Sequence, residues 1–280
     1  ACIAEGIKPI VGCEIYFTPD SELRRDRKPE LYHMILLAKN NIGYHNLIKI
    51  VSLAAVEGFY YKPRVTFESL RDHAEGIIAT SACIAGVVPT SILRRQPEVA
   101  RDWARKLADV FEPGDFYIEL QDQGIITDEG LTQHQLNIEL NALARELGLK
   151  TVAANDMHYL RKQDARTQDI MLCIGINAKF KDPERMRFAN DQFYMKSEEE
   201  MREALGDFQD ACDNTVEIAE KCDVTLPNDI ILPVIPLPEG ETNESMLRKE
   251  ALAGLRRRYG EPLSQEVLER FEYEYRINCD

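Results

Sequence analysis

An alternation of short apolar runs with helical patterns over residues 7–155 constrains the fold of this chain most. Five runs have the length and the β-branched or aromatic content of strands, and they cover residues 7–17, 32–38, 75–83, 115–121 and 150–155. Helical patterns separate them at residues 40–57, 67–74, 97–111 and 127–147. Strands that alternate with helices of this length are typical of parallel βα units. The sequence therefore predicts an α/β fold, either a barrel or a doubly wound sheet.

The chain becomes mainly helical after about residue 162. Ser197 and Glu200 form the pattern of a capping box, and helical apolar spacing continues to residue 223. Prolines then recur over residues 226–242, where they withhold backbone donors and break regular structure. Two charged amphipathic helices are predicted beyond them, at 243–259 and 263–277. The proline-rich segment is thus a predicted domain boundary.

Composition limits the partners of the chain. Its formal net charge of −14 argues against gripping phosphate backbones by itself, although contact with a few nucleotides through a metal stays open. The seven cysteines contain no C-x-x-C pair, which fits a reducing cytoplasm better than a disulfide framework. No apolar run approaches the roughly 18 residues of a membrane helix, so no membrane partner is expected. The chain begins without Met and ends within a helical pattern, which predicts a piece of a longer protein.

Residues 153–160 read AANDMHYL and place a carboxylate and an imidazole directly after an apolar run. In an extended segment, Asp156 and His158 would point to one side, as two ligands of one metal ion would. A helix cap beside a surface histidine is the alternative. Glu14 and Cys83 lie late in other predicted strands, and such mixed donors suit zinc or manganese, with the thiolate favouring zinc.

Each of these residues also has a structural interpretation. Cys83 could be a small buried hydrophobe and His33 a hydrogen-bonded core histidine. A carboxylate beside an apolar strand needs a partner, which makes Glu14 unusual, whereas Glu119 is predicted to be structural. His33 opens its strand, which is the wrong end for a regular barrel unless that strand runs differently. The residues alone leave these alternatives open.

Several other chemistries lack their motifs. The sequence contains no P-loop, no G-x-G-x-x-G and no G-x-S-x-G. It has no Asp-x-Asp pair for two-metal nucleotidyl transfer. The stretch GFYYKPRV at 58–65 could stack on bases, but a loop packed on the domain edge is the favoured interpretation.

Several segments in order resemble the PHP domain of bacterial replicative DNA polymerase III alpha subunits: KPIVGCEIYF, YHMILLAKNNIGYHNLIKIVS, EGIIATSACIAG, FYIELQDQG and ANDMHYL. The similarity continues through FYMKSEEEM and NTVEIAEKCDV to LPEGETNESMLRKEALAGLRRRYG. It implies a distorted (β/α)7 PHP-type barrel that lacks its first strands over residues 1–225. A linker and the helical beginning of the polymerase palm region would follow over residues 226–280.

The resemblance also implies a metal cluster whose ligands in this chain are Glu14, His33, Cys83, Asp156 and His158. Zinc, manganese or iron would occupy it. The family's H-x-H pair and a further histidine region would lie upstream of Ala1, so the visible ligand set is expected to be incomplete. Relatives have FYLELQDHG where this chain reads FYIELQDQG, and Gln123 is not expected to be a lost ligand.

The resemblance implies a fragment of a DNA-directed DNA polymerase of chromosome replication in the cytoplasm. Its catalytic aspartates and their magnesium would lie downstream of this chain. Primer-template DNA and dNTPs would be its substrates, and the sliding clamp, the clamp loader and a proofreading exonuclease subunit its partners. The PHP domain itself would act as a metal-dependent 3′–5′ exonuclease. The alternatives are an inactive structural PHP scaffold and a stand-alone PHP phosphoesterase.

Overall fold

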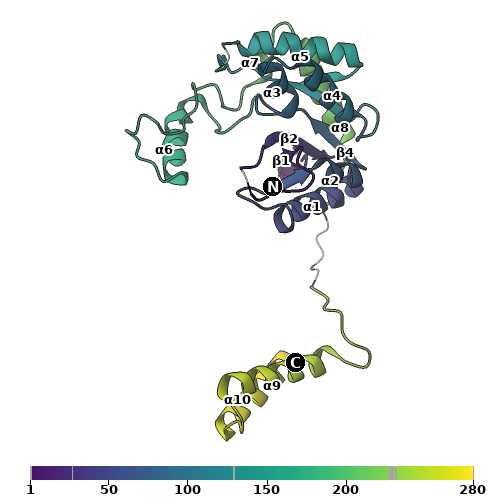
Figure 1. Cartoon of the computed structure of the whole chain (residues 1–280), viewed down its shortest axis with the longest axis vertical. Coiled ribbons are helices and arrows are strands. Elements are labelled where there is room, and N and C mark those ends of the chain that lie inside the picture. Colours follow the sequence, from purple (N-terminus) through teal and green to yellow (C-terminus); the bar gives the residue numbers. More distant parts are fainter. Residues whose placement is uncertain (1, 27, 129, 227–229, 231, 280) are drawn as a thin grey trace. The chain divides into compact units, whose positions relative to one another are not determined.

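The computed structural model describes residues 2–26, 28–128, 130–226, 230 and 232–279, which form two compact units (Figure 1). The first unit, Ala1–Leu226, holds the sheet and the helices up to α8. The second, Pro227–Asp280, holds α9 (Asn243–Tyr259) and α10 (Gln265–Cys279), close to the predicted helices. Within the described part of the chain, no helix has the length and apolar content needed to cross a bilayer.

Six strands form one mixed sheet in the order β3-β1-β2-β4-β5-β6. They are β1 (Gly12–Thr18), β2 (Tyr32–Ala38), β3 (Arg64–Thr66), β4 (Ile77–Thr80), β5 (Phe116–Leu120) and β6 (Lys150–Ala153). The α/β class is confirmed, and an open six-stranded sheet with edges at β3 and β6 is consistent with a distorted barrel that is not closed.

The prediction of parallel βα units is wrong for β2. This strand runs antiparallel to both of its neighbours, β1 and β4, while β4, β5 and β6 are parallel to one another. No helix is described between β1 and β2, so nothing carries the chain across the sheet for a parallel return. The two strands instead pair side by side, which reverses the direction of β2.

The helices of the first unit follow the predicted patterns with shorter bounds. They are α1 (Asn41–Val56), α2 (Phe67–Asp72), α3 (Val87–Leu93), α4 (Pro97–Ala108), α5 (Gln133–Leu147), α6 (Ala165–Gly175), α7 (Glu198–Ala204) and α8 (Gln209–Lys221). The capping box of Ser197 and Glu200 at α7 is confirmed. Helix α3 was not predicted because it is almost wholly buried and has no polar face. The edge-loop prediction for residues 58–65 missed that its end enters the short edge strand β3.

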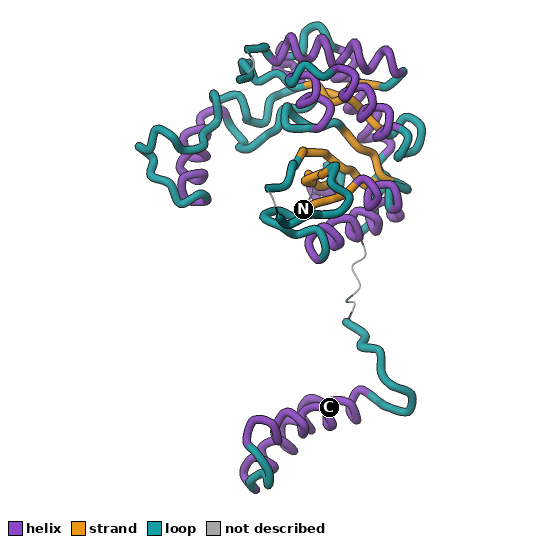
Figure 2. The backbone as a smooth tube through the Cα atoms, viewed as in Figure 1, coloured by secondary structure: helices purple, strands orange, loops and turns teal. Residues whose placement is uncertain are grey.

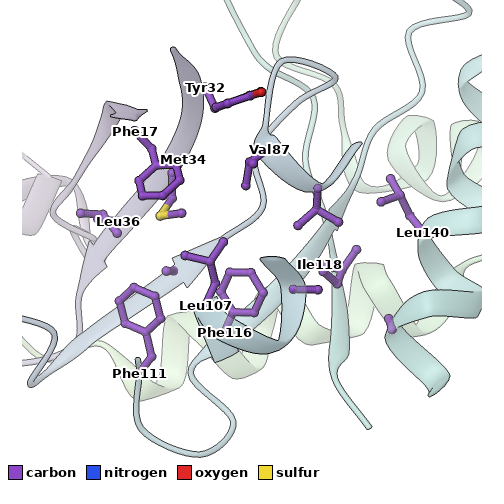
Figure 3. Close-up of a cluster of buried hydrophobic side chains, with 14 of the residues drawn as sticks. Phe17, Tyr32, Met34, Leu36, Val87, Leu107, Phe111, Phe116, Ile118 and Leu140 are labelled. Carbon is purple, nitrogen blue, oxygen red and sulfur yellow. The ribbon is translucent and has the colours of Figure 1, made fainter. Parts of the chain in front are cut away.

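Side chains alternate between two faces of the sheet, as the pleat requires. One face packs against α1, α4 and α5 in the main core, whose buried side chains include Phe17, Met34, Leu36, Leu107, Phe116, Ile118 and Leu140 (Figure 3). On the opposite face, Ile78, Tyr117 and Val152 pack against Ile218 of α8 and against Cys222, which follows the helix. Figure 2 shows the strands lying between helices of the first unit. The smaller apolar cluster under α8 leaves room on this face for polar groups.

A charged cluster joins α8 to the sheet. Glu217 of α8 accepts hydrogen bonds from Lys150 Nζ at 2.5 Å and from the Tyr117 hydroxyl at 2.8 Å, and Lys221 Nζ lies 3.1 Å from the same carboxylate. Lys150 first, with Tyr117 and Lys221, holds the pKa of Glu217 down at about 2. The folded chain therefore binds this proton more weakly than the unfolded chain does.

This carboxylate gives the first prediction. The pKa of Glu217 is lower in the folded chain than the 4.5 of a free glutamate, so its contribution to stability is present above pH 4.5 and is lost as the pH falls toward 2. We expect Glu217→Gln to lower the free energy of unfolding at pH 7 by about 1 kcal/mol, after allowance for solvent screening of a side chain that is 30% exposed. Urea unfolding at pH 7 and pH 3 measures the free energy of unfolding of both proteins. If the difference between wild type and variant were the same at both pH values, the lowered pKa of Glu217 would be contradicted.

Candidate functional site

The reversed direction of β2 explains how His33 reaches the candidate site. His33 lies opposite Tyr16 near the end of β1, and the start of β2 lies beside the end of β4. Strands β4, β5 and β6 are parallel, so their carboxyl ends reach this same edge. The first residues of β2 therefore meet the last residues of its neighbours, which is where α/β proteins place their ligands.

Glu14, His33 and Cys83 are in contact. In the β1–β2 register, Glu14 stands two residues from Tyr16, the partner of His33, and so shares the face of His33. The Glu14 Oε1 atom lies 2.9 Å from His33 Nδ1, and the Cys83 Sγ atom lies 3.5 Å from the same nitrogen. The Glu14 side chain is half exposed rather than buried, and His33 is the partner that this carboxylate needs. Three predicted residues from distant parts of the sequence are thus in contact, with Glu14 and Cys83 both meeting the His33 ring.

The loop that carries Cys83 is tightly held. His33 N–H donates to the Ala85 carbonyl at 3.0 Å, which ties the loop to β2. Ala82 has a φ of 57°, a conformation that residues with a side chain rarely adopt. A Cβ atom on Gly86 would lie 1.9 Å from the Ser81 carbonyl oxygen, so only glycine allows this close turn. The backbone around Cys83 is therefore fixed in an unusual shape, as is common at functional sites.

Asp156 and His158 follow β6 but do not continue as an extended strand. Asp156 has a φ of 47°, so the geometric reason for placing both side chains on one side does not hold. His158 Nδ1 instead lies 2.7 Å from the Asp156 carbonyl oxygen and 3.8 Å from its carboxylate Oδ1. The His158 ring contacts Phe188, with 4.6 Å between centroids. A backbone turn, rather than strand alternation, keeps the two residues together.

A cavity of about 290 Å³ lies between the sheet and α8 and is lined by three of the five predicted residues. Its lining includes Glu14, Cys83 and Asp156, together with Glu119 of β5. Glu119 is buried, with 5% of its surface exposed, and it accepts hydrogen bonds from the Thr80 hydroxyl and the Gln121 amide. The prediction that Glu119 is structural missed that its carboxylate stands in the cavity wall. The signal was a carboxylate inside an otherwise apolar strand.

The charges of the site influence one another. Hydrogen bonding to Cys83 and then to Glu14 raises the pKa of His33 to about 10, and the bond to His33 lowers the pKa of Glu14. Burial raises the pKa of Asp156, and the Glu14 carboxylate adds to that rise while His158 opposes it. Burial also raises the pKa of Glu119, with further contributions from Asp156 and Glu14. The site thus gathers negative charge that a cation would stabilise.

The donor chemistry fits a divalent cation. Among the described residues, no three His, Cys, Asp or Glu side chains are already arranged as a metal-binding group. The Glu14 carboxylate and the Cys83 thiol nevertheless both contact the imidazole nitrogen His33 Nδ1. Zinc or manganese binds a carboxylate, an imidazole and a thiol once these groups are deprotonated. Three carboxyl groups in one cavity wall strengthen the fit. Ligation by the five predicted residues remains a prediction.

An amide network supports the turn that carries Asp156. The Gln123 side chain, almost fully buried, donates to the Asn155 carbonyl at 2.9 Å. The Asn155 side chain donates to the Gln192 and Tyr194 carbonyls and accepts from Lys196 Nζ at 2.9 Å. Gln123 therefore holds the backbone next to the site, and the sequence had marked it only as a difference from relatives.

Comparisons with known proteins identify relatives of this chain. Residues 1–123 match the PHP domain family, a range that contains Glu14, His33 and Cys83. Over 278 residues the chain is 41% identical to the DNA polymerase III subunit alpha of Treponema pallidum, covering 98% of this chain and 23% of that protein. It is 42% identical to the subunit of Borreliella burgdorferi, covering 97% of this chain and 24% of that protein. The subunit of Thermus aquaticus is also 42% identical, covering 94% of this chain and 22% of that protein. The chain spans about a quarter of the length of these relatives.

Proposed function

Because this chain is homologous over nearly its whole length to bacterial DNA polymerase III alpha subunits and carries a PHP domain, we propose that it is part of a replicative DNA polymerase whose PHP domain binds divalent metal ions. The similarity covers both compact units, which argues against a stand-alone phosphoesterase. The observation that carries the metal proposal is the convergence of Glu14, His33 and Cys83 beside a cavity lined by carboxylates.

In this proposal the site serves 3′–5′ phosphodiester hydrolysis. Bound zinc, manganese or iron would polarise a phosphate and lower the pKa of a bound water toward about 7. Five residues of the chain would hold it: Glu14, His33, Cys83, Asp156 and His158. The Thr80 hydroxyl and the Gln121 amide fix the orientation of the Glu119 carboxylate at the cavity wall. No general base is assigned to a residue of this chain.

The whole protein would synthesise DNA with residues outside this chain. Catalytic aspartates there would hold magnesium and add nucleotides to a primer 3′ end, with primer-template DNA and dNTPs as substrates. Residues 226–280, the linker and the two helices of the second unit, would begin the polymerase region. The partners of the whole protein would be the sliding clamp, the clamp loader and a proofreading exonuclease subunit. The whole protein would work in the cytoplasm.

A structural scaffold is the second candidate, and one observation favours it. His33 already hydrogen-bonds Glu14 and lies within reach of Cys83, so these groups have partners without a metal. A PHP domain stabilised in this way could support other subunits without catalysis of its own. The two candidates differ in metal content.

Metal analysis of the longer protein, purified without chelator, tests the proposal. We expect at least one bound zinc, manganese or iron per chain, together with release of nucleotides from the 3′ end of labelled single-stranded DNA. Dialysis against a chelator should abolish that release, and the added metal should restore it. A preparation free of transition metals would contradict the metal proposal, and metal without nuclease activity would favour the scaffold.

A further inference from the structure

The segment between β6 and α7 has a charge opposite to that of the rest of the chain. Residues 157–196, here called the basic arm, contain eight Lys or Arg and five Asp or Glu, a net charge of +3 in a chain of −14. A bridge between Tyr159 and Tyr194 pins the two ends of the arm together beside His158. Figure 1 shows its helix α6 standing apart from the other helices of the first unit. The basic arm therefore projects from the first unit, and its two ends lie next to His158 of the candidate site.

An ion pair inside the arm gives it a fixed shape. Arg185, whose side chain is 2% exposed, makes two hydrogen bonds to the Asp169 carboxylate, at 2.5 Å and 2.6 Å. The Arg185 Nε–H also donates to the Phe180 carbonyl at 3.1 Å. These contacts bind the loop around residue 180 to α6. The exposed side chains of that loop are therefore displayed by an ordered support, which lowers the cost of ordering them on binding.

The arm displays cations that have no acidic partner. Arg166, Lys179 and Lys181 are exposed, and within the described residues none of them takes part in an ion pair. Such cations are free to neutralise phosphates and to release the counterions of a nucleic acid. The negative remainder of the chain would repel the same backbone. Binding would therefore be confined to the arm, which reconciles it with the overall charge of −14.

Aromatic rings lie beside these cations and beside His158 of the candidate site. Phe180 stands between Lys179 and Lys181, is 47% exposed, and has the Arg185 guanidinium 5.0 Å from its ring centroid. Farther along, the ring of Phe188 lies 4.6 Å from the ring of His158. Alternating cations and rings are the pattern by which proteins hold single strands without reading their sequence.

We propose that the basic arm binds single-stranded nucleic acid and leads one end of it to the metal site beside His158. Lys179 and Lys181 contact phosphates, and Phe180 stacks on a base. The delivery step rests on the proposed function, whereas the binding step requires no metal. A test of binding in the presence of EDTA therefore separates the two.

The experiment measures fluorescence anisotropy of a labelled 12-nucleotide oligothymidylate with the 280-residue chain in EDTA, from 50 to 200 mM salt. We expect Lys179→Gln/Lys181→Gln to reduce the slope of log affinity against log salt by about 1.4, at about 0.7 per phosphate contact. Extrapolated from 1 M salt, that change corresponds to about 25-fold weaker binding at 0.1 M salt. Phe180→Ala should weaken binding at least about fivefold and leave the salt slope unchanged. The matched control is Lys28→Gln/Lys49→Gln, two exposed lysines outside the arm, which should bind as wild type does.

Each outcome decides the proposal. If Lys179→Gln/Lys181→Gln and Lys28→Gln/Lys49→Gln weakened oligonucleotide binding equally, binding would depend on overall charge and not on the basic arm. That result would overturn the proposal. So would a wild-type chain with no salt-dependent binding, which would leave the arm as a surface for a protein. Arm-dependent oligonucleotide binding in EDTA would support the arm whatever the outcome for the metal, and only the metal content of protein purified without chelator would contradict the metal proposal.

Discussion

Replacing Asp156 with asparagine is expected to weaken metal binding at the proposed PHP site by at least about tenfold and to lower the proposed 3′–5′ exonuclease activity with it. Asp156 lines the cavity, where burial raises the pKa of its carboxyl group and the Glu14 carboxylate adds to that rise. Asparagine has the same shape and tolerates the φ of 47° observed at this position. The variant therefore removes a charge and a ligand without a reason for misfolding. His158→Ala should act in the same direction.

The measurement is metal content after dialysis against buffered zinc or manganese, with exonuclease and polymerase rates of the longer protein in parallel. Asp102→Asn is the matched control, because Asp102 is exposed on α4 at the far face of the sheet from the cavity. Polymerase activity should change much less than exonuclease activity. Equal loss of both, accompanied by a lower melting temperature, would instead identify a metal that holds the domain together. Unchanged metal content would exclude Asp156 as a ligand.

The elements of the fold could be predicted, but the direction of one strand could not. Hydrophobic periodicity located the strands of the first unit except β3, because their core-facing side chains are uninterrupted apolar runs. Strand β3 has three residues and lies at an edge, which leaves little periodicity to detect. The antiparallel direction of β2 depends on the helix-free connection after β1, and loop sequences carry no such signal.

The same reversal limited what could be said of the site. His33 opens its strand and seemed to lie at the wrong end, whereas the antiparallel pairing brings it to Glu14 and Cys83. These three residues are 14, 33 and 83 in the chain, so no local spacing could reveal their contact. Resemblance to a family supplied the set before the geometry was known. The position of Glu119 in the cavity wall could not be predicted, because its partner Thr80 becomes a neighbour only when β4 pairs with β5.

Gly43→Ala is expected to lower the free energy of unfolding of the first unit by about 3 kcal/mol or more. Gly43 lies in the first turn of α1, where a Cβ atom would stand 1.7 Å from the Gly76 carbonyl oxygen. The same carbonyl accepts a hydrogen bond from Lys39 N–H at 2.9 Å, and Asn40 caps the helix by accepting from Gly43 N–H at 3.0 Å. The new Cβ atom would clash with a backbone atom, so the clash cannot be relieved by the rotation of a side chain. Relief requires the helix start and the turn before β4 to separate.

Thermal and urea unfolding measure this effect, and a fall in melting temperature of about 6–12 °C corresponds to 3 kcal/mol in a unit of this size. Gly175→Ala is the matched control, because a Cβ atom at Gly175, the last residue of α6, meets nothing within 4 Å. Its stability should change by less than about 1 kcal/mol, as expected for Gly-to-Ala at an open helical position. If Gly43→Ala behaved like this control, α1 would not pack on the turn at Gly76. Since α1 also contacts β2, a separation there would loosen the strand that carries His33, and metal binding should weaken together with stability.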